Sequence, residues 1–322
     1  MKSYERILLI ARRDMQRSPA LREAALLARE CGAALHIAIF DHSATLDVVA
    51  RVRAEDAQGL REAFLRQRRD WLNEQAEELR ASGVTVTVEA VWCRHPLDEI
   101  LAHVVESKAD LVVKDVEMHH GMRRVLMTSL DWQLVRDCPA PVFLVHGEQL
   151  SPRRIVVAAD AMKGADDPLN QKIVHHAANL AYATDAKLDL AFAFQAFATA
   201  DLVAPMAAPA LTGELYETLY KLYRDDFDQF ADANSVPQDA RHFLIGPAAP
   251  ALARFVREHD VDVLVMGTTH YGTLDRLLLG STASALLDDL PCSVLVVKSD
   301  AFAAALAAQI RERLQVPGRR AA

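Results

Sequence analysis

The sequence predicts an α/β fold of two tandem, doubly wound domains, each built on a five-stranded parallel sheet. The second half of the chain repeats the first over a long stretch without a gap. Each half alternates short apolar runs with amphipathic stretches, a pattern typical of a parallel sheet covered by helices on both faces. At 322 residues, the chain is long enough for two domains of about 150 residues each.

The repeat is clearest when residues 109–145 are placed over residues 261–297. The identical pairs include Asp110 and Asp262, Arg124 and Arg276, Leu126 and Leu278, Ser129 and Ser281, and Pro139 and Pro291. The openings of the two copies match as well, since residues 6–12 lie over 154–160. The two alignments have offsets of 148 and 152 residues, which differ by only four, so a duplicated domain explains the similarity.

The elements of the first copy follow from apolar runs and end signals. Residues 7–11 form a continuous apolar run, which predicts a strand buried on both faces. Residues 18–32 predict a helix with Ser18 as N-cap, Pro19 in its first turn and Gly32 at its end. The other predicted strands are 34–40, 84–92, 110–114 and 141–145, and the other predicted helices are 56–81, 96–107 and 129–136.

The second copy repeats this order. Its predicted strands are 155–159, 187–194, 240–245, 262–266 and 293–297, and its predicted helices are 168–183, 214–233, 248–258 and 281–288. An Ala- and Pro-rich segment, 198–213, is too apolar for an ordinary solvated loop, and 300–314 predicts a short helix before a frayed end. We therefore expect domains at 1–150 and 151–300 and a tail at 301–322.

Composition and charge exclude several classes of protein. A net charge of −8 argues against a nucleic-acid partner, and we interpret Arg66, Arg68 and Arg69 as a solvated helix face because acidic residues surround them. The chain has no apolar run of about 18 residues and no signal-peptide pattern, so we expect no membrane insertion and a cytoplasmic location. The four cysteines lack metal or redox spacing, which predicts free buried thiols.

The loop after the fourth strand of the second copy is the candidate ligand site. Gly267, Thr268 and Gly272 follow the strand directly, and Gly280 precedes Ser281 and Thr282 at the start of the next helix. Ligands of open parallel sheets bind at the carboxyl ends of the strands. Glycines there let backbone N–H groups approach a phosphate, and a hydroxyl can donate a further hydrogen bond. A glycine turn followed by an ordinary Ser N-cap is the alternative interpretation.

These residues resemble a known family. The run MGTTHYGTLDRLLLGSTAS followed by PCSVLVV is similar to the carboxyl-terminal signature of the universal stress protein (UspA-type) family, whose ATP-binding members carry G-x2-G-x9-G-[S/T]. Gly267, Gly280 and Ser281 match this motif, whereas His270 stands at the second glycine and Gly272 follows it. The resemblance implies a Rossmann-like fold of the adenine nucleotide alpha hydrolase type, with ATP and Mg²⁺ as ligands. It also assigns roles to Asp160, which closes the first strand of the copy, and to Gly246 after the third.

The first copy departs from the motif. Asp115, Met118 and Thr128 replace the three glycines, and Arg12 replaces the strand-end Asp. A carboxylate in the cradle would repel phosphate, so we expect no nucleotide in this copy. The segments VVKDVEMHH, MTSLDWQLVRDCPAPVFLV and AVWCRHPLDEIL resemble the tandem-domain, UspE-type group of the family, over about residues 5–300. In that group the first domain lacks the nucleotide loop.

Histidines of the first copy suggest a second kind of site. Zinc is bound by histidine, cysteine and carboxylate side chains, and this copy offers His119, His120, His95 and His103 together with Asp115, Glu117 and Cys93. Surface histidines are the interpretation we favour, so no metal site is assigned. Motifs of nucleophilic or metal-dependent hydrolases are absent from the sequence, and no catalytic residue is assigned.

Three functions remain open on the sequence alone. The first is a stress-response protein that binds ATP or a related nucleotide in its second domain. The second is a binding or scaffold module for an apolar lipid or acyl ligand, suggested by 198–213 and the lost glycine, and the third is a slow ATPase. Single-domain members of the family pair through their last strand. The resemblance therefore implies an intramolecular pseudo-dimer with 141–145 beside 293–297, which could form a homodimer in turn.

Overall fold

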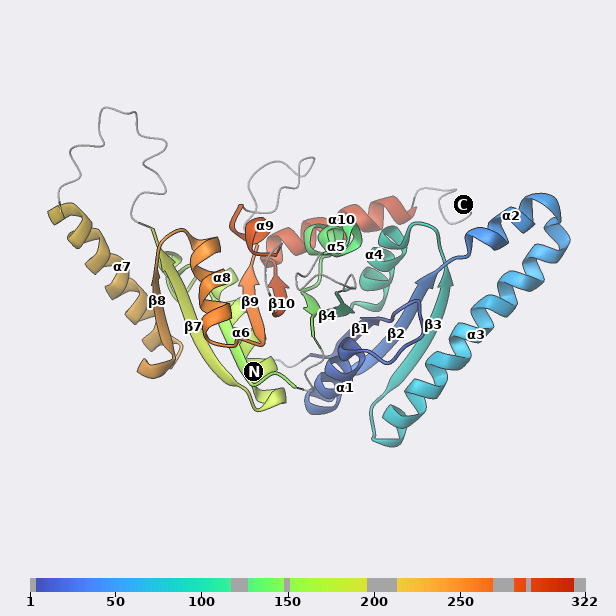
Figure 1. Ribbon diagram of the computed structural model, residues 1–322, viewed down its shortest axis with the longest axis horizontal. Helices are drawn as coiled ribbons and strands as arrows, with labels where there is room; N and C mark the ends of the chain where they lie inside the picture. Colours follow the sequence, from blue (N-terminus) through green and yellow to red (C-terminus); the bar gives the residue numbers. More distant parts are fainter. Residues whose placement is uncertain are drawn as a thin grey trace, which may run out of the picture. The chain divides into compact units, whose positions relative to one another are not determined.

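The computed structural model describes residues 4–116, 127–147, 151–195, 213–268, 281–287 and 291–315, which fold as two compact units. Unit 1 holds the described residues up to Ser151 together with 301–315, and unit 2 holds the described residues from Pro152 to Asp300 (Figure 1). Each unit is an open parallel sheet with helices on both faces, so the predicted fold class is confirmed.

Unit 1 has the strand order β3-β2-β1-β4-β5, and every neighbouring pair is parallel. Its strands are β1 (Arg6–Ile10), β2 (Ala34–Asp41), β3 (Val86–Trp92), β4 (Leu111–Asp115) and β5 (Val142–Val145). Its helices are α1 (Pro19–Cys31), α2 (Ala44–Val52), α3 (Ala54–Ala81), α4 (Pro96–Ser107), α5 (Ser129–Asp137) and nearly all of α10 (Asp300–Gln315). Helices α1 and α3 cover one face of the sheet, and α4 and α5 cover the other (Figure 1).

Unit 2 repeats this arrangement with the order β10-β9-β6-β7-β8, again parallel throughout. Its strands are β6 (Arg154–Ala158), β7 (Lys187–Phe194), β8 (Arg241–Ile245), β9 (Val263–Gly267) and β10 (Ser293–Val297). Its helices are α6 (Pro168–Thr184), α7 (Gly213–Ala233), α8 (Ala248–Glu258) and α9 (Ser281–Leu287), with a short 3₁₀ turn at Ala161–Lys163.

The repeat is visible in hydrogen bonds as well as in sequence. In unit 1 the Asp110 carboxylate accepts from the backbone N–H groups of Glu5 and Arg6, at 2.7 and 3.2 Å. In unit 2 its counterpart Asp262 accepts from the N–H groups of Arg153 and Arg154, at 2.8 and 2.9 Å. Equivalent carboxylates therefore accept hydrogen bonds from the backbone N–H groups at the start of the first strand in each unit.

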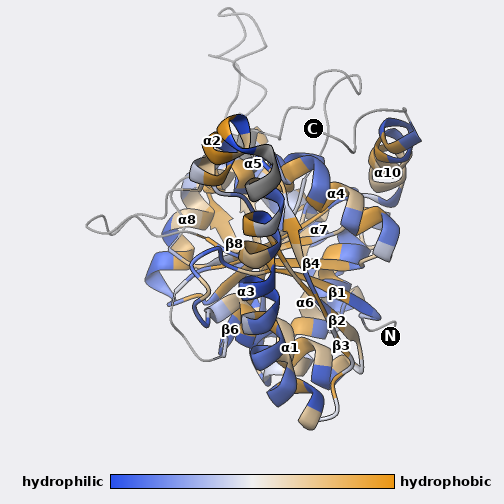
Figure 2. Cartoon of the chain, turned by 90° about the vertical axis from the view of Figure 1, so that its right-hand side faces the viewer, coloured by the Kyte–Doolittle hydropathy of each residue, from blue (hydrophilic) through white to orange (hydrophobic). Residues whose placement is uncertain are grey.

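The core of each unit lies along its central strands. The strands carry the colours of hydrophobic residues in Figure 2, and β4, β5 and β10 are buried along their whole length. Burial on both faces explains why the sequence shows continuous apolar runs there rather than alternation. At the start of α1, the Ser18 hydroxyl accepts from the Leu21 N–H, and Gly32 ends the helix at a φ of +67°, so both predicted end signals are confirmed.

Helix α2 was not predicted, and α3 extends the predicted helix 56–81 back to Ala54. Helix α2 begins after Ser43, whose hydroxyl accepts from the Leu46 N–H, and none of its residues is buried.

The prediction that Arg66, Arg68 and Arg69 share a solvated face is wrong for Arg68. Its guanidinium group is buried, and its Nε lies 2.7 Å from Oδ2 of Asp41 at the end of β2. A buried carboxylate needs a paired cation, and the long stem of an arginine can reach inward from a polar helix face. Arg66 and Arg69 are exposed, as expected.

The four cysteines form no disulfides, as predicted, but only three are buried, because Cys31 at the end of α1 is partly exposed. Among the described residues, none of the helices has both the length and the apolar character needed to cross a bilayer.

Candidate functional site

The site predicted from sequence lies where the winding of unit 2 reverses. From β6 the chain passes to β7 on one side and later returns to β9 on the other side of β6. Ala158 is paired with Met266 at the last register position of β6 and β9, and Asp160 and Thr268 each lie two residues further on. The fold therefore brings these two predicted site residues to one sheet edge, at the position where doubly wound sheets bind ligands.

Asp160 is held in place by a residue that the sequence analysis missed. Asn170, buried in the first turn of α6, accepts from the Asp160 N–H at 3.2 Å and donates to the Asp160 carbonyl oxygen at 2.8 Å. The Asp160 carboxylate is half exposed and lies 3.8 Å from Nζ of Lys163. Asn170 therefore fixes the backbone and leaves the carboxylate accessible. Its only sequence signal is an amide three residues after the helix-capping Asp167.

Gly267 lies against the side chains of α6. A Cβ at this position would lie 2.7 Å from Cδ1 of Ile173 and 3.0 Å from Cδ2 of Leu169, both on α6. Contacts this short do not occur between unstrained carbon atoms. The missing side chain therefore lets α6 pack closely on the end of β9, in addition to any approach of a ligand to the backbone.

Thr268 presents a buried hydroxyl at the same strand end. Its side chain is 7% exposed, and its N–H donates to the Val297 carbonyl oxygen at 2.9 Å. Its Oγ1 has no hydrogen-bond partner among the described residues. A buried hydroxyl left unpaired costs about 1–3 kcal/mol, so a polar ligand atom at this point would be stabilised.

Gly246 follows β8 with a φ of +122°, a conformation that L-residues rarely adopt. Its N–H donates to the carbonyl oxygen of Phe194, the last residue of β7, at 2.9 Å. Of the other predicted site residues, His270, Gly272 and Gly280 lie outside the described residues. Ser281 and Thr282 form the first turn of α9, where only the backbone is described.

Unit 1 fills the equivalent strand end with its own charges. The buried Lys114 Nζ lies 2.8 Å from Oδ1 of Asp131, which is fully buried in the first turn of α5. Asp131 also forms a capping box with Thr128, and so places a carboxylate at the start of α5. Asp115, which stands at the Gly267 position, accepts from the Ala20 N–H at 2.9 Å. Burial raises the pKa of Asp115 above its ordinary value.

These charges have neutral counterparts in unit 2. Lys114, Asp115 and Asp131 align with Met266, Gly267 and Ala283 at the offset of 152 residues. The Asp115 carboxylate is a negative charge at this strand end of unit 1, and Asp131, paired with Lys114, already places an anion at the start of α5. The strand ends of the two units therefore differ in charge.

Of the residues considered for zinc, Cys93, His95 and His103 line one cavity of unit 1. Cys93 is buried directly after β3, and the Asp115 carboxylate is bound to the backbone of α1. His119, His120 and Glu117 lie outside the described residues. His103, however, faces His36 of β2 and Glu89 of β3, a group that the sequence analysis did not assemble.

Comparison with known proteins gives one family for both units. Residues 3–146 and 152–298 each match the model of the universal stress protein family. Universal stress protein E of Escherichia coli K12 is 25% identical over 309 residues, which cover 94% of this chain and 96% of that protein. Universal stress protein E of Photorhabdus laumondii is 23% identical over 306 residues, covering 94% and 97%.

A solved structure shows the same tandem fold. The functionally unknown protein PA1789 from Pseudomonas aeruginosa PAO1 superposes with a TM-score of 0.75 at 24% identity, over 97% of this chain and 98% of that one. Since the family model covers nearly the whole of both units, the chain belongs to the universal stress protein family, and it is similar to that family's tandem-domain E-type members.

Proposed function

We propose that the chain is a cytoplasmic stress-response protein that binds ATP, with Mg²⁺, at the carboxyl ends of β6 and β9 in unit 2. Asp160, Gly246, Gly267 and Thr268 would line the site, joined by His270, Gly272, Gly280, Ser281 and Thr282 from the adjoining loop and helix. The single observation that carries this proposal is the buried hydroxyl of Thr268, which has no partner within the described part of the chain, at the point where the winding reverses.

The hydroxyl of Thr268 is the feature that distinguishes this position from its counterpart in unit 1. Val116 stands in unit 1 where Thr268 stands in unit 2, and its N–H makes the equivalent bond, to Val145, also at 2.9 Å. Both side chains are 7% exposed. Valine therefore fits the position, and threonine brings an unpaired hydroxyl into it. The free-energy cost of burying this hydroxyl without a partner is offset if the hydroxyl donates to an oxygen of a bound ligand. Triphosphate oxygens are strong acceptors.

Bound Mg-ATP would supply charge and binding energy. The output we propose is a change in the stability and conformation of unit 2 on binding. We also propose that the chain is an intramolecular pseudo-dimer through 141–145 and 293–297, to be tested by cross-linking cysteines placed in those strands.

The test is isothermal titration of the full-length protein with Mg-ATP, using Thr268→Val as the main variant. We expect about 10–100-fold weaker binding, the loss of one hydrogen bond to a charged group, together with an ATP-free protein that is more stable by about 1–3 kcal/mol. Thr184→Val is the matched control, because the Thr184 hydroxyl already donates to the Leu180 carbonyl oxygen, at 2.8 Å. It should leave ATP affinity unchanged.

Asp160→Ala and Arg12→Ala form a second matched pair at the ends of β6 and β1, since the two residues are equivalent in the repeat. Only Asp160→Ala should weaken binding. Absence of heat at millimolar Mg-ATP, or equal affinities for wild type and Thr268→Val, would refute the proposal. Native mass spectrometry of the same preparation would then reveal whether a lipid occupies the protein instead.

A further inference from the structure

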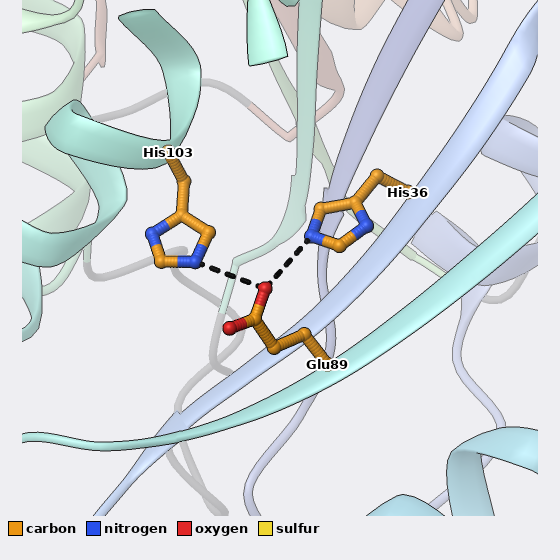
Figure 3. A group of neighbouring side chains, drawn as sticks. All are labelled: His36, Glu89 and His103. Atoms are coloured by element: carbon orange, nitrogen blue, oxygen red, sulfur yellow. Dashed lines mark hydrogen bonds and ion pairs between the residues drawn. The ribbon is translucent and has the colours of Figure 1, made fainter. Parts of the chain in front are cut away.

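Three side chains of unit 1 converge on one point, on the face of the sheet that α4 covers. His36 comes from β2, Glu89 from β3 and His103 from α4 (Figure 3). Oε2 of Glu89 lies 3.3 Å from Nε2 of His103 and 3.6 Å from Nε2 of His36. The two imidazole rings are nearly parallel, at 11°. Both present the same nitrogen to one carboxylate oxygen.

The local structure explains this convergence. His36 is paired with Thr87 in the parallel register of β2 and β3, and Glu89 lies two residues beyond Thr87. Side chains two residues apart on a strand point to the same face, so His36, Thr87 and Glu89 share one side of the sheet. Helix α4 packs on β2 at that side and brings His103 over them.

The outer nitrogen of each imidazole is already occupied. Nδ1 of His103 lies 2.7 Å from the Glu99 carbonyl oxygen, which can only accept, so Nδ1 carries a proton. Nε2 is hydrogen-bonded to Oε2 of Glu89 at 3.3 Å, and in the neutral ring this nitrogen holds the lone pair that a metal would take. Nδ1 of His36 lies 2.8 Å from the Thr87 hydroxyl, which orients that ring in the same way. Hydrogen bonds of this kind, from the far nitrogen of the ring, are characteristic of metal-binding histidines.

The spacing of the three atoms also suits a metal. For metal–ligand bonds of about 2.0–2.1 Å, tetrahedral ligands lie roughly 3.3–3.5 Å apart. The two distances from Glu89 are close to this range, and all three ligand atoms lie within 4.8 Å of one another. The group opens into a cavity of about 1020 Å³ in unit 1, which is also lined by His95, Glu106 and Arg313.

We propose that His36, Glu89 and His103 bind a divalent transition metal, with zinc as the best match, and leave one coordination position open to the cavity. Two imidazoles and one carboxylate are a ligand set that zinc uses where a water or small molecule takes the fourth place. The open position faces both acidic and basic side chains, so a small anion or a water molecule can complete the coordination.

Unit 2 provides an internal contrast at the same positions. By the repeat and the strand registers, His36, Glu89 and His103 correspond to Asp189, His242 and Phe255. Asp189 pairs with Arg154 at 2.7 Å, and the Phe255 ring packs on His242 at 4.5 Å between centroids. In unit 2 the phenyl ring of Phe255 therefore stands in place of the imidazole of His103, and Arg154 neutralises Asp189, which stands in place of His36. In unit 2 these positions form a polar cluster that includes an arginine, whereas in unit 1 they present three side chains of metal-binding type.

The experiment uses full-length protein that has been stripped with a chelator, reloaded with zinc and dialysed, and it measures metal per chain by mass spectrometry. We expect one zinc per wild-type chain. In His103→Phe, which introduces the unit 2 residue, affinity should fall by more than the roughly 10–100-fold that loss of a second-shell partner costs. Thr87→Val removes only the partner of His36 and should weaken binding by about 10–100-fold.

Two controls separate this site from other histidines. His95→Ala changes the same cavity without removing a ligand and should retain one zinc. The double variant His119→Ala, His120→Ala should also retain it. Cobalt loading adds a readout of geometry, because tetrahedral cobalt absorbs strongly in the visible range, and this absorption should disappear in His103→Phe. Tryptophan fluorescence verifies that each variant is folded.

Wild-type protein that holds no metal after dialysis would overturn the proposal. So would metal that is lost in the His119, His120 variant but kept in His103→Phe, or octahedral cobalt spectra in the wild type. Since ATP is proposed for unit 2, a failure of the zinc experiment leaves the nucleotide proposal intact, and the reverse holds as well.

Discussion

The ion pair between Lys114 and Asp131 occupies, in unit 1, the strand end that corresponds to the proposed site of unit 2, and its energetics can be tested. Lys114 Nζ lies 2.8 Å from Oδ1 of Asp131, and their side chains are 9% and 0% exposed. Removing one partner of a buried pair costs about 3–5 kcal/mol, because the other charge stays buried without compensation. We therefore expect Lys114→Met and Asp131→Ala each to destabilise unit 1 by about that amount.

The double variant should behave differently. Lys114→Met with Asp131→Ala introduces the pair of residues that unit 2 has at Met266 and Ala283, so neither partner of the ion pair is left buried without the other, and of the neighbouring charges only the Asp115 carboxylate is retained. The remaining cost is loss of the capping box at α5, about 0.5–2 kcal/mol. The double variant should thus be more stable than either single variant, although it has lost more interactions.

Tryptophan fluorescence during urea unfolding measures unit 1 selectively. The three tryptophans of the chain, Trp71, Trp92 and Trp132, all belong to unit 1. At about 2–4 °C per kcal/mol, each single variant should also lower the melting temperature by roughly 6–20 °C. If the two single effects simply add in the double variant, Lys114 and Asp131 are not energetically coupled, and a buried ion pair does not close this strand end of unit 1.

Three further predictions concern buried groups. Burial raises the pKa of Glu23 from 4.5 to about 7, so unit 1 should lose about 3 kcal/mol of stability as pH rises from 4.5 past 7. Glu23→Gln should abolish that loss in tryptophan-monitored urea titrations, and an unchanged slope would contradict it. Asp189 is buried, which raises its pKa, but the nearby His242 and the hydrogen-bonded Arg154 outweigh burial and lower the pKa from 3.8 to about 2. Its roughly 2 kcal/mol of stabilisation is present above pH 4 and lost as pH falls toward 2, which far-UV circular dichroism should show for wild type and not for Asp189→Asn. Gly267→Ala should cost about 1–3 kcal/mol through its contact with Ile173, and adding Ile173→Val should recover part of that cost in thermal melts.

The sequence was sufficient for the parts of the fold that depend on burial. Continuous apolar runs located strands such as β1, β6 and β10, and the repeat aligned Asp110 with Asp262, which bind equivalent backbone groups in the structure. The sequence was insufficient for features whose position does not depend on burying apolar side chains. Helix α2 buries nothing, and Arg68 reaches inward from a face whose neighbours are exposed.

The candidate sites show the same division. Asp160 and Thr268 were found because a sequence motif and a strand end coincide. The zinc ligands were not, because His36, Glu89 and His103 lie on three elements whose juxtaposition depends on strand register and helix packing. One signal was present: a histidine interrupts the apolar run 34–40, where a strand buried on both faces would have none.

Gly267 shows why a motif residue should not be assigned a single role. The sequence pattern places a glycine where phosphate is expected, and the structure places Ile173 and Leu169 within 3.0 Å of the missing Cβ. Close packing of α6 would preserve this glycine even in a protein that binds no nucleotide. Thr268 lacks such a second role, because Val116 fills the same space in unit 1. The hydroxyl of Thr268 is therefore the stronger indicator of a ligand, and its replacement by valine separates binding from folding more cleanly than any change at the glycine.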